Sequence, residues 1–192
     1  MPKLQPRPSR LRHALVPLAA ATALLLSACA GMAPGKPASW AAPQTVVGPS
    51  SFTGVHGLAV DKQGRLLAGS VVGNAIWEVD RSTGAAKILV DGPDGQADDI
   101  AIAPNGAMAW TNYLQGAVRI RDNDQQPSRV IASGLPGLNS LAFDPRNGKL
   151  YATQVFLGDA LWELDPSGAK PPRQIAKDLG GLNGFEVGPD GM

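Results

Sequence analysis

One short phrase occurs four times in this chain, and its recurrence limits the fold more than any other feature. The copies are HGLAVDKQG from His56, DDIAIAPNG from Asp98, NSLAFDPRNG from Asn139 and NGFEVGPDG from Asn183. They follow one another at intervals of roughly 42 residues, and self-similarity at such a period is typical of stacked structural repeats. The chain is therefore expected to fold as a series of similar units.

Each phrase places alternating apolar residues before a turn that contains glycine, as Leu58 and Val60 do before Gly64. This alternation is typical of a β-strand followed by a hairpin turn. Three more strand-like segments complete each unit, for example RLLAGS, AIWEVD and AKILV in the first. Four short antiparallel strands per unit predict the blade of a β-propeller. Helical repeats are excluded, because no window after Gly48 keeps apolar residues at helical spacing before Gly, Pro or Asn-Gly interrupts it.

Three complete blades are predicted over residues 56–97, 98–138 and 139–182, and the phrase at Asn183 begins a fourth. The segment 45–47 is interpreted as a short strand that would complete the outer edge of a last blade. Propellers remove unpaired strand edges by closing into a ring, which three blades and one strand do not achieve. We therefore expect an all-β fold, a β-propeller of four-stranded blades, present here as a fragment of a longer propeller.

The N-terminal segment has the features of an export signal. Basic residues precede an apolar run from Ala14 to Leu26 that is too short to span a membrane. The single cysteine, Cys29, follows in the sequence LSAC, which resembles a bacterial lipobox whose cysteine is acylated. An ordinary signal peptide with an incidental cysteine is the alternative. The predicted organisation is a lipoprotein-type signal peptide over 1–28, a flexible linker over 29–42 and a partial propeller domain over 43–192.

Composition narrows the partners and the location. A lone cysteine cannot form an intramolecular disulfide. The formal net charge is +1 and the basic residues are scattered, which argues against a nucleic-acid surface. Contact with a membrane is expected only through the lipid anchor. Ala30 follows the cysteine where an aspartate would alter sorting, so we expect the outer membrane, facing the periplasm.

The candidate site lies where the four phrases begin. Because the first strand of every propeller blade lines the central channel, we expect the starting residues to meet at one channel mouth: His56, Asp98, Asn139 and Asn183. Carboxylate and amide oxygens suit a hard cation such as calcium, and imidazole extends the choice to transition metals. Short polar residues also begin strands for structural reasons, so both interpretations stay open.

Two other equivalent sets are assigned structural roles. Polar residues end the second strands at Ser70, Asn112 and Gln154, where a glycine-containing turn follows. They could line the mouth beside the first set, but polar residues are common before such turns, so a structural role is favoured. Trp77 and Trp162 occupy one position in the third strands, with Ile120 nearby in blade two, and are predicted to pack between blades.

Through its repeated phrases and the turn at residues 79–84, VDRSTG, the chain resembles the senescence marker protein/gluconolactonase family of six-bladed propellers over residues 43–192. It is less similar to NHL-type propellers and to streptogramin lyases. The resemblance implies a divalent cation, calcium or a transition metal, at the channel mouth and hydrolysis of a small-molecule lactone.

In that family a Glu, an Asn and an Asp hold the cation. Their places in this chain correspond to His56, Asn139 and Asn183, of which only Asn139 matches. The contacts to the lactone would fall near Asp98 and Asp99. Because Asn183 cannot accept a proton from a metal-bound water, His56 is the candidate base. Fewer carboxylates also weaken affinity for calcium.

Two functions remain open at this point. One is a metal-dependent lactone hydrolase carried on a lipid anchor. The other is a non-catalytic, NHL-like propeller that binds a small molecule or a protein at the channel face. A streptogramin-type lyase would need a catalytic histidine beyond the residues of this chain. The sequence does not define the oligomeric state.

Overall fold

The chain forms β-strands joined by short turns, as the alternating pattern predicts. The computed structural model describes residues 40–49, 52–188 and 190. The predicted signal peptide, Cys29 and most of the predicted linker lie outside these described residues. Within them, no helix is long and apolar enough to cross a membrane.

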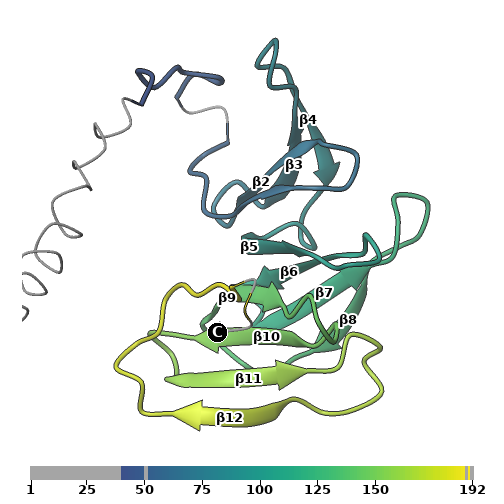
Figure 1. Ribbon diagram of the computed structural model, residues 1–192, viewed down its shortest axis with the longest axis vertical. Helices are drawn as coiled ribbons and strands as arrows, with labels where there is room; N and C mark the ends of the chain where they lie inside the picture. Colours follow the sequence, from purple (N-terminus) through teal and green to yellow (C-terminus); the bar gives the residue numbers. More distant parts are fainter. Residues whose placement is uncertain (1–39, 50–51, 189, 191–192) are drawn as a thin grey trace, which may run out of the picture. The chain divides into compact units, whose positions relative to one another are not determined.

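Twelve strands in the described residues form three antiparallel sheets of four strands each (Figure 1). Blade one contains β1 (Leu58–Val60), β2 (Leu66–Ser70), β3 (Ala75–Val79) and β4 (Ala86–Val90). Blade two contains β5 (Ala97–Ile102), β6 (Met108–Asn112), β7 (Ala117–Arg121) and β8 (Arg129–Ala132). Blade three contains β9 (Leu138–Phe143), β10 (Leu150–Gln154), β11 (Ala160–Leu164) and β12 (Arg173–Lys177). Strand order along each sheet follows the sequence, so the predicted fold of four-stranded blades is confirmed.

In blades one and three, the aspartate of the repeated phrase closes the turn between the first and second strands. In blade one, the backbone amides of Gln63 and Arg65 donate to Oδ1 of Asp61 at 3.0 and 2.9 Å. In blade three, Asp144 accepts the backbone amide of Arg146 at 2.9 Å. The Arg146 side chain also donates to this carboxylate, which lowers the pKa of Asp144 to about 2. Local side-chain bonds of this kind explain why the phrase ends in a tight turn.

Two predicted strands are not formed. Residues 183–188, at the start of the fourth phrase, and residues 45–47 have no strand conformation. A strand needs a neighbouring strand to accept and donate its backbone hydrogen bonds. Each segment would pair with a strand that the described residues do not contain. The predictions of strands at 45–47 and 183–188 are therefore wrong for the described residues.

The hydrophobic core lies between successive blades. Leu67 and Ile76 of blade one pack in one cluster with Ile100, Met108 and Trp110 of blade two. A second cluster joins blades two and three through a larger set: Val118, Ile120, Ile131, Leu138, Leu141, Phe143 and Leu150. Blade two contributes residues to both clusters, and its packing against blades one and three sets where the starts of the first strands lie.

The predicted tryptophan position differs in blade two. Trp77 and Trp162 are partly buried in the third strands, and Trp162 packs against the cluster between blades two and three. The equivalent residue in blade two is Arg119, not Ile120, and it pairs across the sheet with Trp110 of the second strand. Trp110 is fully buried and its Nε1 donates to the Asp94 carbonyl at 2.7 Å. In blade two the tryptophan therefore lies on the second strand instead of the third, on the same face of the sheet.

One face of blade one has no blade against it among the described residues. Leu58 of β1 is 60% exposed, whereas its equivalents Ile100 and Leu141 are 5% and 3% exposed. Blades one and two, respectively, cover those two equivalents. The position of Leu58 is therefore a blade-packing position that is open to solvent in the described part of the chain.

Candidate functional site

The four residues predicted at the channel mouth lie around one cavity. This mouth cavity has a volume of about 430 Å³ and is lined by His56, Val71, Asp98, Tyr113, Asn139, Phe156 and Asn183. The polar residues come from the starts of the phrases, and the other three come from the turns between second and third strands. The predicted convergence of His56, Asp98, Asn139 and Asn183 is therefore present in the structure.

Asp98 is the carboxylate of this cavity. Nδ1 of His56 lies 3.7 Å from Oδ1 of Asp98, and Nδ2 of Asn139 donates to Oδ2 at 3.1 Å. The Asp98 side chain is only 15% exposed, and the His56 side chain is 39% exposed. Burial raises the pKa of Asp98; His56 opposes the increase and Asp99 adds to it. A carboxylate held in this way attracts cations and protons to the mouth.

Close packing between first strands places His56 beside Asp98. Gly57 follows His56, and a Cβ atom at Gly57 would lie 2.7 Å from both the Asp98 carbonyl oxygen and the Asp99 Cα. Any side chain at this position would force the two blades apart. Glycine after the histidine is thus needed for the distance between the imidazole and the carboxylate.

Two threonines hold the backbone at the asparagines. Oγ1 of Thr111 donates to the Asn139 carbonyl at 2.8 Å, and Oγ1 of Thr153 donates to the Asn183 carbonyl at 3.2 Å. Both threonines lie in second strands, and each bridges to the first residue of the following phrase. No role was predicted for these threonines, although they directly precede Asn112 and Gln154, which occupy equivalent positions in their blades.

Asp99 faces the neighbouring blade instead of lining the mouth cavity. Its Oδ2 accepts hydrogen bonds from the Ser140 hydroxyl at 2.7 Å and from the Leu141 amide at 2.9 Å. Its Oδ1 accepts the Ile100 amide at 2.8 Å. The carboxylate thus links blades two and three, whereas Asp98, the other predicted substrate contact, is open to the cavity.

The polar ends of the second strands are buried and bonded to the protein, in line with their predicted structural role. Oγ of Ser70 accepts the Gly73 amide at 2.8 Å, and Nδ2 of Asn112 donates to the Pro93 carbonyl at 3.1 Å. Nε2 of Gln154 donates to the Pro136 carbonyl at 2.7 Å. Ser70 closes its own turn, whereas Asn112 and Gln154 bind the segments that lead into their blades. None of the three lines the cavity.

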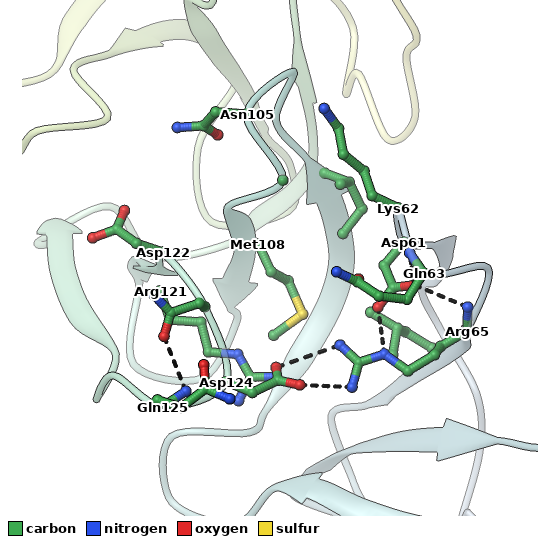
Figure 2. Close-up of a pocket in the computed structure, with 14 residues that line it drawn as sticks. Asp61, Lys62, Gln63, Arg65, Asn105, Met108, Arg121, Asp122, Asp124 and Gln125 are labelled. Atoms are coloured by element: carbon green, nitrogen blue, oxygen red, sulfur yellow. Dashed lines mark hydrogen bonds and ion pairs between the residues drawn. The ribbon is translucent and has the colours of Figure 1, made fainter.

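A second cavity, of about 480 Å³, lies between blades one and two at the opposite ends of the strands. Figure 2 shows the Asp124 carboxylate there between the side chains of Arg65 and Arg121. Arg65 donates to Asp124 at 2.7 Å and Arg121 donates at 2.8 Å. The hydrogen bond from Arg65 lowers the pKa of Asp124. These ion pairs link blades one and two. Because the charges neutralise one another, this cavity is a weaker candidate site than the mouth.

The mouth offers a modest set of metal ligands. No group of three His, Cys, Asp or Glu side chains suited to a metal ion occurs in the described residues. The cavity instead combines one carboxylate, two amides and one imidazole. This donor set fits a divalent cation held weakly, since a single anionic oxygen supplies little of the charge that calcium requires.

No family model matches the chain, and no curated protein matches it in sequence. Solved structures do match. A gluconolactonase from Xanthomonas campestris is 26% identical, with a TM-score of 0.60, over 71% of this chain and 54% of that one. Virginiamycin B lyase from Staphylococcus aureus, an inactive variant with quinupristin, is 17% identical, with a TM-score of 0.61, over 77% and 50%.

A chain of a nidogen/laminin complex is 22% identical, with a TM-score of 0.58, over 68% of this chain and 51% of that one. The chain thus spans about half the length of the solved structures that it matches. The three blades and these likenesses define the chain as part of a β-propeller, a fold that it shares with gluconolactonases and with streptogramin-type lyases.

Proposed function

We propose that the propeller is a metal-dependent hydrolase of a small lactone, with its reaction centre at the mouth cavity. The observation that carries this proposal is the position of Asp98 between His56 and Asn139, with Asn183 lining the same cavity. The likeness to a gluconolactonase supports the choice of a lactone as substrate. A fold alone does not define an activity, so the site residues must support the chemistry.

The cation would be held by Asn139 and Asn183, with Asp98 as the charged ligand, and by His56 wherever its imidazole serves as a ligand instead of as the base. When bound, the cation would act as a Lewis acid on the lactone carbonyl and lower the pKa of a water molecule. His56 has two roles open to it, ligand and base, and its proximity to Asp98 supports the second. Nδ1 of His56 lies 3.7 Å from Oδ1 of Asp98, so the carboxylate can orient the imidazole.

Hydrolysis requires a proton to move from water to the ring oxygen. The water oxygen adds to the carbonyl carbon, the ring C–O bond breaks, and the product is a hydroxy acid. His56 accepts the proton from water and returns it to the departing oxygen. Asp98 keeps the imidazole oriented through these two steps.

Calorimetric titration with calcium, manganese and zinc tests the metal, and hydrolysis of δ-valerolactone with and without a chelator tests the activity. We expect weak binding by the wild type and loss of activity with chelator. Asn139→Ala should weaken metal binding, and His56→Ala should reduce kcat at saturating metal. Asn123→Ala, in a turn at the opposite ends of the strands, is the matched control and should change neither.

Binding of a small molecule without hydrolysis would favour the alternative function, a non-catalytic propeller that uses the channel face. Absence of metal binding by the wild type, or equal binding by wild type and Asn139→Ala, would refute the metal site. Circular dichroism of each variant separates loss of a ligand from loss of the fold.

Export and lipidation are part of the proposal and rest on the sequence around Cys29. The anchor would hold the propeller at the outer membrane, facing the periplasm. Labelling of cells with palmitate should mark the wild type and not Cys29→Ser. A label that persists in Cys29→Ser would refute lipidation at this residue.

A further inference from the structure

The three turns between second and third strands each carry an exposed apolar side chain at the mouth. Val72, Leu114 and Phe156 each lie two residues beyond the end of the second strand in their blades, and they are 69%, 67% and 78% exposed. Leu157, which follows Phe156, is 66% exposed. We call these four residues the apolar rim.

The apolar rim is confined to one end of the blades. The turns between third and fourth strands lie at the other end and have polar sequences, such as RSTG in blade one and DNDQQ in blade two. Solvent-exposed apolar side chains are not unusual singly, but their repetition at one equivalent position around a cavity marks a binding surface. Packing within the blades does not require them, because their side chains remain in solvent.

One residue of the apolar rim, Phe156, lines the mouth cavity, and Val72 and Leu114 directly follow residues that line it. Val71, Tyr113 and Phe156, one from each of the three turns, line the cavity together with the polar residues at the starts of the phrases. Phe156 belongs to both sets. Its backbone has a φ of 65°, a left-handed conformation that is rare for an aromatic residue and costs energy. Hydrogen bonding of the Leu157 amide to the Val155 carbonyl at 2.8 Å holds this turn.

We infer that the mouth selects a lactone that carries an alkyl or aryl substituent. The polar ring would meet Asp98, His56 and Asn139 at the centre, and the substituent would lie against Phe156 and its neighbours in the apolar rim. A sugar lactone would expose its hydroxyl groups to side chains that can neither donate nor accept a hydrogen bond. The lactone identity rests on the proposed function, whereas the preference for an apolar substituent rests on the rim.

Binding can be separated from hydrolysis with lactams, in which an amide replaces the ester. The test compares δ-valerolactam with the same ring bearing a pentyl chain, by calorimetry on the wild type, Leu114→Ser and Phe156→Ser. Val130→Ser and Ile88→Ser are matched controls, because those residues are 45% and 46% exposed on the outer strands β8 and β4. Hydrolysis of δ-valerolactone and its pentyl derivative is measured in parallel.

We expect the pentyl lactam to bind more tightly than the parent ring to the wild type and to both controls. Each rim substitution should reduce that preference about tenfold, the effect of removing one partly buried apolar contact. Equal binding of the two lactams, no detectable binding of either, or equal effects of rim and control substitutions would overturn the inference. Rim-dependent binding to phosphatidylglycerol vesicles without a lactam preference would assign the surface to a membrane and overturn it too.

The two proposals fail in different ways. If the pentyl lactam binds through the apolar rim but neither lactone is hydrolysed, the binding inference stands and the proposed hydrolase is wrong. If both lactones are hydrolysed at rates that the rim substitutions leave unchanged and the two lactams bind equally, the hydrolase stands and the inference is wrong.

Discussion

The hydroxyl of Thr111 donates a hydrogen bond to the Asn139 carbonyl at 2.8 Å and accepts one from the Asp99 amide at 2.9 Å. One side chain in the second strand of blade two thus joins the first strands of blades two and three. Both of those strands begin at the mouth cavity. The spacing of Asp98 and Asn139 therefore depends on a residue that does not line the cavity.

Replacing this hydroxyl with a methyl group should destabilise the chain. Thr111→Val keeps the shape of the side chain but leaves a buried amide and a buried carbonyl without their partner. We expect the free energy of unfolding to fall by about 1–3 kcal/mol in urea denaturation. Thr83→Val, at an exposed turn, is the control and should change it by no more than about 0.5 kcal/mol. Equal effects of the two variants would contradict the role of Thr111.

Substitution of Asp98 should stabilise the folded chain at neutral pH in the absence of divalent metal. Because burial raises its pKa, the folded state holds this proton more tightly than the unfolded state. Stability therefore falls as the pH rises from the unfolded-state pKa of Asp98, near 3.8, through its raised pKa in the folded state. In urea denaturation, the free energy of unfolding of Asp98→Asn should exceed that of the wild type at about pH 7 and match it at about pH 3. A variant that is less stable than the wild type at neutral pH would show that the carboxylate is stabilising.

Trp110 should be the most costly of the tryptophans to remove. It is fully buried between blades one and two, and its indole hydrogen bond to Asp94 is 2.7 Å long. Trp110→Ala should lower the free energy of unfolding by about 3–5 kcal/mol. Trp40→Ala is the control, because Trp40 is 93% exposed and its loss should cost less than about 0.5 kcal/mol. A small effect at Trp110 would mean that the blade interface can close over the cavity.

The open face of blade one should make residues 43–192 self-associate. Leu58 and Val60 are 60% and 54% exposed at positions where the other two blades pack on a neighbour. Light scattering on the isolated segment should give a mass above that of a monomer, and Leu58→Lys with Val60→Lys should reduce it. Ile88→Lys, on the outer strand, is the control. A monomer that unfolds sharply and cooperatively would contradict this expectation.

Some parts of the site could be predicted by aligning the repeated phrases, and others could not. The convergence of His56, Asp98, Asn139 and Asn183 follows from the repeat, because equivalent positions in successive blades meet at the channel. The separate orientations of Asp98 and Asp99 do not follow from it. Alternate strand residues point to opposite faces, but only the neighbouring Ser140 and Leu141 determine which carboxylate is bonded away from the cavity.

By itself, the sequence determined the elements that depend on local physics. Period-two alternation, the aspartate that closes the turn before glycine, and the repeat length specify the four-stranded blade without reference to any distant residue. Tertiary structure decided what depends on contacts between blades: the burial of Trp110, the hydrogen bond from Thr111 to Asn139, and the exposure of Leu58. The physical reason is that strand patterns arise from contacts between adjacent segments, whereas burial and site geometry arise from contacts between residues about one blade apart in the chain.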